Sequence, residues 1–133
     1  MARNKSVEAF AKLTEDMQMQ IHADAVAELN AQADALVGRM KSVAPAGPTG
    51  KLASSIRKEA TRRPTIVRVR AGGATTLITT EQHPYDYARA VEFGTHKMSA
   101  QSFFFPSYRL MKKTMRAAMR RKITKTIKQY SAG

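Results

Sequence analysis

The sequence predicts an α+β fold: a long N-terminal helix, a small antiparallel β-meander, a short helix and a basic, amphipathic C-terminal helix. Three observations predict it. Apolar residues recur at helical spacing over residues 6–43 and again over 106–129, prolines and glycines cluster in 44–50, and β-branched residues alternate with polar ones within 51–80. The 133 residues suffice for a single domain, 1–133, with one core.

The long helix is expected to run from Ser6, a favoured N-cap residue, to Val43, because Pro45 cannot continue it. Its apolar stripe consists of Phe10, Leu13, Met17, Ile21, Leu29, Ala33, Leu36, Met40 and Val43. A straight helix of that length, rising about 1.5 Å per residue, extends about 57 Å, whereas a compact domain of this size is about 36 Å across. We therefore expect either a break near Asn30 or Gly38, or a stripe that another subunit completes.

The middle of the chain predicts a loop followed by strands. Residues 44–50 contain two prolines and two glycines, which favours a loop. Residues 51–60 are expected to form a strand, and 65–71 a second, half-buried one. After Gly72 and Gly73, the β-branched run 75–80 predicts a third strand, so a three-stranded antiparallel meander is the simplest assembly.

A short helix is predicted over residues 85–94. Tyr87, Ala88 and Val91 would face inward, and Gly94 suits the left-handed position that ends a helix. The chain then continues as a loop with an apolar tip of three phenylalanines, Phe103, Phe104 and Phe105. Consecutive rings on an extended chain point to alternating sides, so at least one is expected at the surface or against another protein.

The last helix is predicted over 106–129, with Pro106 in its first turn. The apolar stripe is Met111, Met115, Met119, Ile123 and Ile127. The helix also carries nine cations, Arg109, Lys112, Lys113, Arg116, Arg120, Arg121, Lys122, Lys125 and Lys128. The stripe lacks the Trp and Phe that usually anchor a helix at a membrane surface.

The charge of the chain is large and uneven. The net charge is +13, yet residues 1–50 hold six acids and five bases, a net charge of −1, and no acid follows Glu92. Such a basic second half favours a polyanion such as DNA, bound without regard to sequence, or an acidic protein. The alternative is a solvated helix face, since cations are also favoured at a helix C-terminus.

The sequence lacks the residues that most catalytic or cofactor sites need. There are no cysteines, which excludes disulfides, thiolate zinc sites and a cysteine nucleophile. His22, His83 and His96 lack metal-ligand spacing, and Gly47 and Gly50 are too close together for a phosphate-binding loop. We expect no metal and no cofactor.

Asp86 and Glu92 form the one acidic pair near a possible cleft, and each is expected to bind a neighbouring arginine or a backbone group instead of a substrate. We therefore expect a protein that is not an enzyme. No apolar run approaches the roughly 18 residues of a membrane span, and the first residues do not resemble a signal peptide. The protein is expected to be soluble and made inside the cell.

Three motifs in order carry a resemblance to a known family: Pro45-x-x-Pro-Thr-Gly-x-Leu-x-x-Ser-Ile56, Tyr87-Ala-x-x-Val-Glu-Phe-Gly-Thr95 and Ala100-Gln-x-Phe-x-x-Pro106. Together they resemble the neck or tail-completion proteins of long-tailed bacteriophages, the gene-product-ten-like proteins of HK-type lambdoid phages, akin to minor tail protein Z. The motifs span residues 44–106. Ser102 stands where this family usually has proline.

The resemblance implies a structural virion protein of the neck, made in the bacterial host cytoplasm and acting at head–tail joining or tail completion. It implies a homo-oligomeric ring, six-fold in the virion, around the DNA channel, between the head connector and the tail tube or tail terminator. The motif residues would be architectural or lie at subunit interfaces: Thr49, Gly50, Leu52, Ser55, Tyr87, Ala88, Val91, Glu92, Phe93, Gly94, Thr95, Phe103, Phe104, Phe105 and Pro106.

Two further expectations combine the charge with what the resemblance implies about a DNA channel. Glu92 is expected to hold a partner's arginine or a backbone N–H. The residues expected to face DNA in the channel or an acidic partner are Arg109, Lys112, Lys113, Arg116, Arg120 and Arg121. The alternative function is that of a sequence-nonspecific DNA-binding protein.

Overall fold

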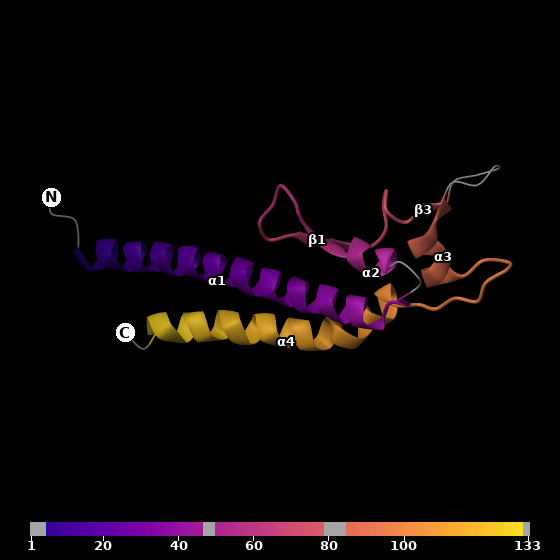
Figure 1. The fold of residues 1–133 in the computed structure, drawn as a ribbon. Coiled ribbons are helices and arrows are strands. Elements are labelled where there is room, and N and C mark those ends of the chain that lie inside the picture. Colours follow the sequence, from indigo (N-terminus) through magenta and orange to yellow (C-terminus); the bar gives the residue numbers. More distant parts are fainter. Residues whose placement is uncertain (1–4, 47–49, 79–84, 132–133) are drawn as a thin grey trace.

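The computed structural model describes residues 5–46, 50–78 and 85–131 (Figure 1). Its elements are α1 (Lys5–Val43), α2 (Lys51–Ser55), β1 (Arg57–Ala60), β2 (Val67–Arg70), β3 (Leu77–Ile78), β4 (Tyr85–Asp86), α3 (Tyr87–Phe93) and α4 (Phe104–Ser131). This order confirms the predicted α+β fold class. Thr49, His83 and the end of the predicted third strand lie outside the described residues.

The helix α1 is continuous, so the expected break near Asn30 or Gly38 does not occur. The Asn30 side chain donates a hydrogen bond back to the Val26 carbonyl, 2.8 Å away, and Gly38 has no packing neighbour that would bend the helix there. Figure 1 shows α4 running antiparallel beside α1 for most of its length. Much of the apolar stripe of α1 is therefore covered by the same chain.

The strand predicted over 51–60 is wrong in its first half, because Lys51–Ser55 forms the short helix α2. Gly50, with a φ of +64°, turns the chain into this helix. Leu52, Ser55 and Ile56 are all buried. Their spacing of three and four residues places them on one side of a helical turn.

The prediction of a three-stranded meander is also wrong, since the strands form two separate antiparallel pairs, β1 with β2 and β3 with β4. In the first pair Arg57 lies opposite Arg70. The pairs are separate because Gly72 and Gly73, with φ of +92° and +130°, turn the chain away after β2. The third strand then pairs with residues just before α3 and not with β2.

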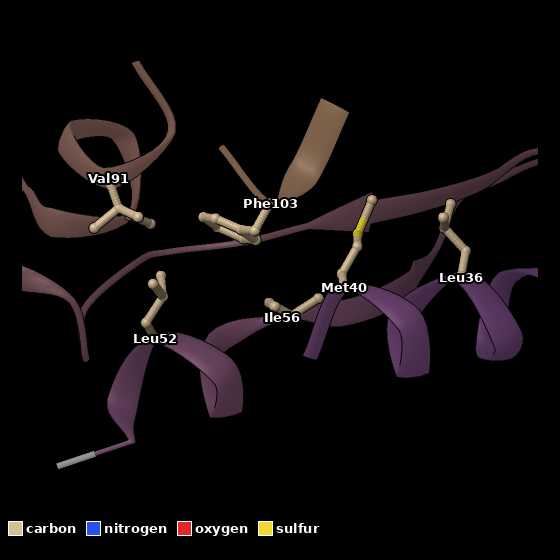
Figure 2. Packing of buried hydrophobic residues seen from close by; sticks show 7 residues of the cluster. Leu36, Met40, Leu52, Ile56, Val91 and Phe103 are labelled. Atoms are coloured by element: carbon tan, nitrogen blue, oxygen red, sulfur yellow. The ribbon is translucent and has the colours of Figure 1, made fainter. Parts of the chain in front are cut away.

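The hydrophobic core lies where the C-terminal end of α1, α2, α3 and the start of α4 meet. Figure 2 shows Phe103 and Val91 on one side and Leu52, Ile56 and Met40 on the other. Phe103 and Ile56 are only 1% exposed, and Met40 is fully buried. We call this packed part, residues 33–46, 50–78 and 85–111, the compact end. We call the rest of the helix pair, residues 5–32 and 112–131, the arm.

The last helix begins two residues before the predicted start and ends two residues after the predicted end, at Ser131. The line that packs against α1 also differs from the predicted stripe. The buried residues of α4 are Ser107, Ala118 and Thr126, of which Thr126 binds α1, whereas Ile127 is 40% exposed. A strict spacing of four residues drifts by about 40° per step around an α-helix, so the predicted stripe turns away from α1 along the helix.

Candidate assembly interface

The carboxylate of Glu92 caps α4. It lies at the end of α3, is 6% exposed, and accepts backbone hydrogen bonds from Phe103 and Phe104 at 2.8 and 2.9 Å and from Phe105 at 3.0 Å. The first N–H groups of a helix have no partner within the helix, and a negative charge there is favourable. Of the two roles expected for Glu92, the structure shows the backbone one.

The loop between α3 and α4 is tied back to α3. The Ser102 hydroxyl donates to the Glu92 carbonyl at 2.6 Å, and the Gln101 N–H donates to Val91 at 2.8 Å. Gly94, with a φ of +78°, ends α3, and a Cβ atom there would lie 2.9 Å from the Ala100 nitrogen. Serine at 102 thus ties the loop to α3 through its hydroxyl.

The start of α3 is held in the same way. The Asp86 carboxylate accepts the Ala88 N–H at 2.9 Å and the Thr76 hydroxyl at 2.6 Å, so this acid is also bound to a backbone group as expected. Ala88 and Val91 are buried and Tyr87 is half-buried. The N-terminal residue of α3 is thus fixed by β3–β4 and the C-terminal part by the core.

The three phenylalanines differ in how exposed their side chains are. Phe103 is in the core, Phe104 is half-buried, and Phe105 is 44% exposed, as expected for at least one ring. Phe105 lies 6.0 Å, centroid to centroid, from Phe93, which is 64% exposed. Of the remaining motif residues, Thr95 is exposed and Pro106 is half-buried. The prediction that the rings form a loop tip is wrong, because Phe104 and Phe105 already belong to α4.

A groove of about 790 Å³ lies where the arm joins the compact end. It is bounded by α1, β2 and α4. Its apolar lining comes from Leu29, Ala33, Leu36, Met40, Val67, Val69, Met115, Met119 and Ile123. Three cations of α4, Lys112, Arg116 and Arg120, line one flank. The groove is therefore apolar with a basic margin, and sequence reasoning missed it because it depends on how three elements diverge.

The six predicted basic residues lie on α4 and most are exposed. Arg109, Lys113, Arg116, Arg120 and Arg121 are exposed, and Lys112 is half-buried. At about 100° per residue, the five from 109 to 120 fall within an arc of about 100°. The Lys112 ammonium lies 5.9 Å from the centroid of the Tyr108 ring. Arg109, Lys113 and Arg121 are exposed and do not line the groove, and we call these three residues the outer basic face.

The arm is held partly by polar contacts. The buried Thr126 hydroxyl donates to the Asp24 carboxylate at 2.5 Å, and the Tyr130 hydroxyl reaches the Asp16 carbonyl at 3.4 Å. The hydrogen bond from Thr126 is the main cause that holds the pKa of Asp24 below its ordinary value of 3.8. A hydrogen bond from Gln20 acts the same way, partial burial opposes both, and the charges of Lys122 and Lys125 add a smaller lowering.

Several site types find no support in the part of the chain that the structure describes. No three His, Asp or Glu side chains there are grouped to hold a metal ion. None of the described helices is long and apolar enough to cross a membrane. The features that stand out are surfaces: the groove, the outer basic face and the exposed aromatic pair.

Comparison with known proteins gives a family. A family model described as "Bacteriophage HK97-gp10, putative tail-component" matches residues 8–94, which is 87 of the 133 residues. No curated protein and no solved structure matches the chain significantly. The match covers α1, both strand pairs and α3 through Gly94, and it confirms the resemblance carried by the first two motifs. The chain belongs to the HK97-gp10-like family of bacteriophage tail components.

Proposed function

We propose that this protein is a structural subunit of the virion neck, acting at head–tail joining or tail completion, and that it has no catalytic role. Its copies form a ring around the DNA channel between the head connector and the tail tube or tail terminator. The family supports a structural phage protein. The ring, its six-fold symmetry and its place in the neck belong to the proposal.

The observation that carries the channel role is the outer basic face of Arg109, Lys113 and Arg121. It lies on a helix whose core contacts are on the other side, so its charge is not used for folding. Cations in such a row neutralise phosphates without reading the base sequence, which suits DNA that must pass through. Glu92 and Asp86 are bound to backbone groups and serve the architecture.

The placement in the neck is tested by electron microscopy of lysates from the encoding phage or prophage with this gene deleted. We expect filled heads without tails and free tails, or tails with ragged head-proximal ends. Normal, infectious particles would remove the structural proposal. The basic helix would then be the surface of a sequence-nonspecific DNA-binding protein.

The channel role is tested separately by Arg109→Glu combined with Lys113→Glu. We expect the particles to assemble and the infectious titre to fall at least tenfold, because DNA meets negative charge in the channel. The matched control is Arg62→Glu with Arg63→Glu, the same charge change at two exposed residues between β1 and β2. Equal titres for both variants would contradict the channel role. Tight, salt-sensitive duplex binding by the purified protein would favour the alternative function.

A further inference from the structure

The N-terminal end of α1 carries an apolar face that nothing covers among the residues the structure describes. Residues 5–13 are all exposed, and Val7, Phe10 and Leu13 are 62%, 69% and 46% exposed. By helical geometry these three side chains continue the stripe of Met17 and Ile21, which lie beside α4. Figure 1 shows α1 extending past the end of α4. A helix end of this length is marginal in water without packing.

The groove cannot take this segment of its own chain. Leu29, at one end of the groove, and Leu13 lie on the same continuous helix. Sixteen residues at about 1.5 Å each separate them by about 24 Å. An unbroken helix cannot fold back over that distance, so only another copy can bring this segment to the groove.

The two surfaces are complementary in charge as well as in polarity. The segment Val7–Asp16 of α1 holds three acids and one base. Glu15 and Asp16 directly follow the exposed apolar residues, and both are exposed. The groove has an apolar lining and a basic margin of Lys112, Arg116 and Arg120. An apolar helix face next to acids therefore matches an apolar groove next to cations.

We propose that the segment Val7–Asp16 of one copy docks into the groove of the next copy. The contact joins two different surfaces, so it propagates head to tail, and it closes into a ring when the rotation between copies allows. This inference rests on the proposed function, because it assigns the contact that builds the proposed ring. It names the apolar face of Val7, Phe10 and Leu13 as the inserted element.

The absence of cysteine from the chain makes crosslinking a direct test. Phe10→Cys and Met119→Cys are combined in the full-length protein, incorporated into phage particles and treated with a short bismaleimide. We expect a ladder of covalent oligomers from the double variant and no ladder from either single variant. The controls are Met19→Cys with Met119→Cys, because residue 19 is half a turn around α1 from residue 10, and Phe10→Cys with Lys113→Cys, outside the groove.

The outcomes separate the inference from the proposed function. Dimers from Phe10→Cys alone would mean that two α1 ends meet each other, and they would overturn the inference while the chain remains a virion protein. Particles that contain the protein but give no more ladder with Phe10→Cys than with Met19→Cys would also overturn it. Absence of the chain from particles would overturn the proposed function and the inference that rests on it.

A charge exchange provides a test on surface residues that do not disturb the core. Glu15→Lys with Asp16→Lys, and separately Arg116→Glu with Arg120→Glu, should each lower the ladder yield at least fivefold. Combining both pairs should restore most of it, because the attraction is re-formed with its signs reversed. If the arginines act on DNA, the combined variant should not regain ladder yield. A combined variant whose ladder yield is as low as that of either pair would overturn the inference.

Discussion

The compact end and the arm differ in how completely they bury their apolar residues. In the compact end Phe103, Ile56 and Met40 are almost completely buried, and Glu92 accepts three backbone hydrogen bonds. In the arm the contact line runs through small or polar residues such as Ala118 and Thr126. The compact end buries a closed core and leaves Phe93 and Phe105 exposed at its surface, whereas the arm has no such core and exposes much of its apolar and charged surface.

The difference indicates where the proposed function would place its assembly surfaces. No buried side-chain nitrogen or oxygen lacks a partner in the described part of the chain. The buried polar atoms of the compact end are thus all satisfied. Phe10 and Met19 on the arm are 69% and 67% exposed, and the groove begins where the arm starts. Changes in the compact end should act on folding, and changes in the arm should act mainly on assembly.

The largest effect should come from the core. Phe103→Ala should lower the free energy of unfolding by about 3–5 kcal/mol, since it leaves a cavity among α1, α2 and α3. The matched control Phe105→Ala removes a ring that is 44% exposed and should cost about 1 kcal/mol. Urea unfolding followed by circular dichroism measures both. Similar losses would mean that the compact end does not have the closed core described.

A smaller effect should follow from the cap of α4. Glu92→Gln keeps the shape of the side chain but removes the charge and replaces one acceptor oxygen, so we expect a loss of about 1–3 kcal/mol in the free energy of unfolding. The control is Glu59→Gln, which weakens surface ion pairs to Arg57 and Arg70 and should cost about 0–1 kcal/mol. Urea unfolding followed by circular dichroism measures the loss in both variants. A loss at Glu92 no greater than at Glu59 contradicts the capping role.

Glycine replacement should have opposite signs at two positions of the compact end. Gly38 lies inside α1 with no atom near a new Cβ, so Gly38→Ala should raise the free energy of unfolding by about 0.5–1 kcal/mol. Gly94→Ala should destabilise the protein, because its φ is positive and the Cβ would meet the Ala100 backbone. Thermal unfolding midpoints compare the two. A lower unfolding midpoint for Gly38→Ala would mean that another part of the protein packs against the backbone at this position.

The smallest effect concerns the acid response of the arm. The pKa of Asp24 is lowered by folding, so its contribution is complete above the ordinary value of 3.8 and is lost as the pH falls through the lower folded pKa. Thr126→Val removes the hydrogen bond that is the main cause of the lowered pKa. The Asp24 pKa should therefore move upward, which an NMR titration of the carboxyl carbon measures. Thr114→Val, at an exposed position of α4, should leave it unchanged. An unchanged pKa in Thr126→Val would exclude the hydrogen bond as its cause.

The helices were predictable because their signals are local. Pro45 and the apolar spacing placed the end of α1 correctly, and Gly94 marked the end of α3. The start of α4 was missed because its cap comes from Glu92, eleven to thirteen residues away, and Pro106 is tolerated anywhere in a first turn. The helix α2 was missed because five residues are too few for a clear period.

The groove and the exposed end of α1 could not be predicted from the sequence. They depend on the register in which α4 meets α1, which the contacts of Thr126 with Asp24 and Tyr130 with Asp16 fix. The basic residues of α4 were evident in the sequence, but the division between a groove margin and an outer face was not. That division depends on which positions along α4 border the groove, because Arg109 and Lys113 lie at nearly the same angle around the helix as Arg116 and Arg120.

The pairing of Asp24 with Thr126 joins residues 102 positions apart in the chain. A ribosome adding about 5–20 residues per second needs about 5–20 s to make the intervening chain. During that time α1 has been synthesised, but its apolar face is exposed to water because α4 has not yet been made. The arm is therefore the last part of the molecule to form, and the interval between the synthesis of its two helices sets when a subunit first acquires the groove.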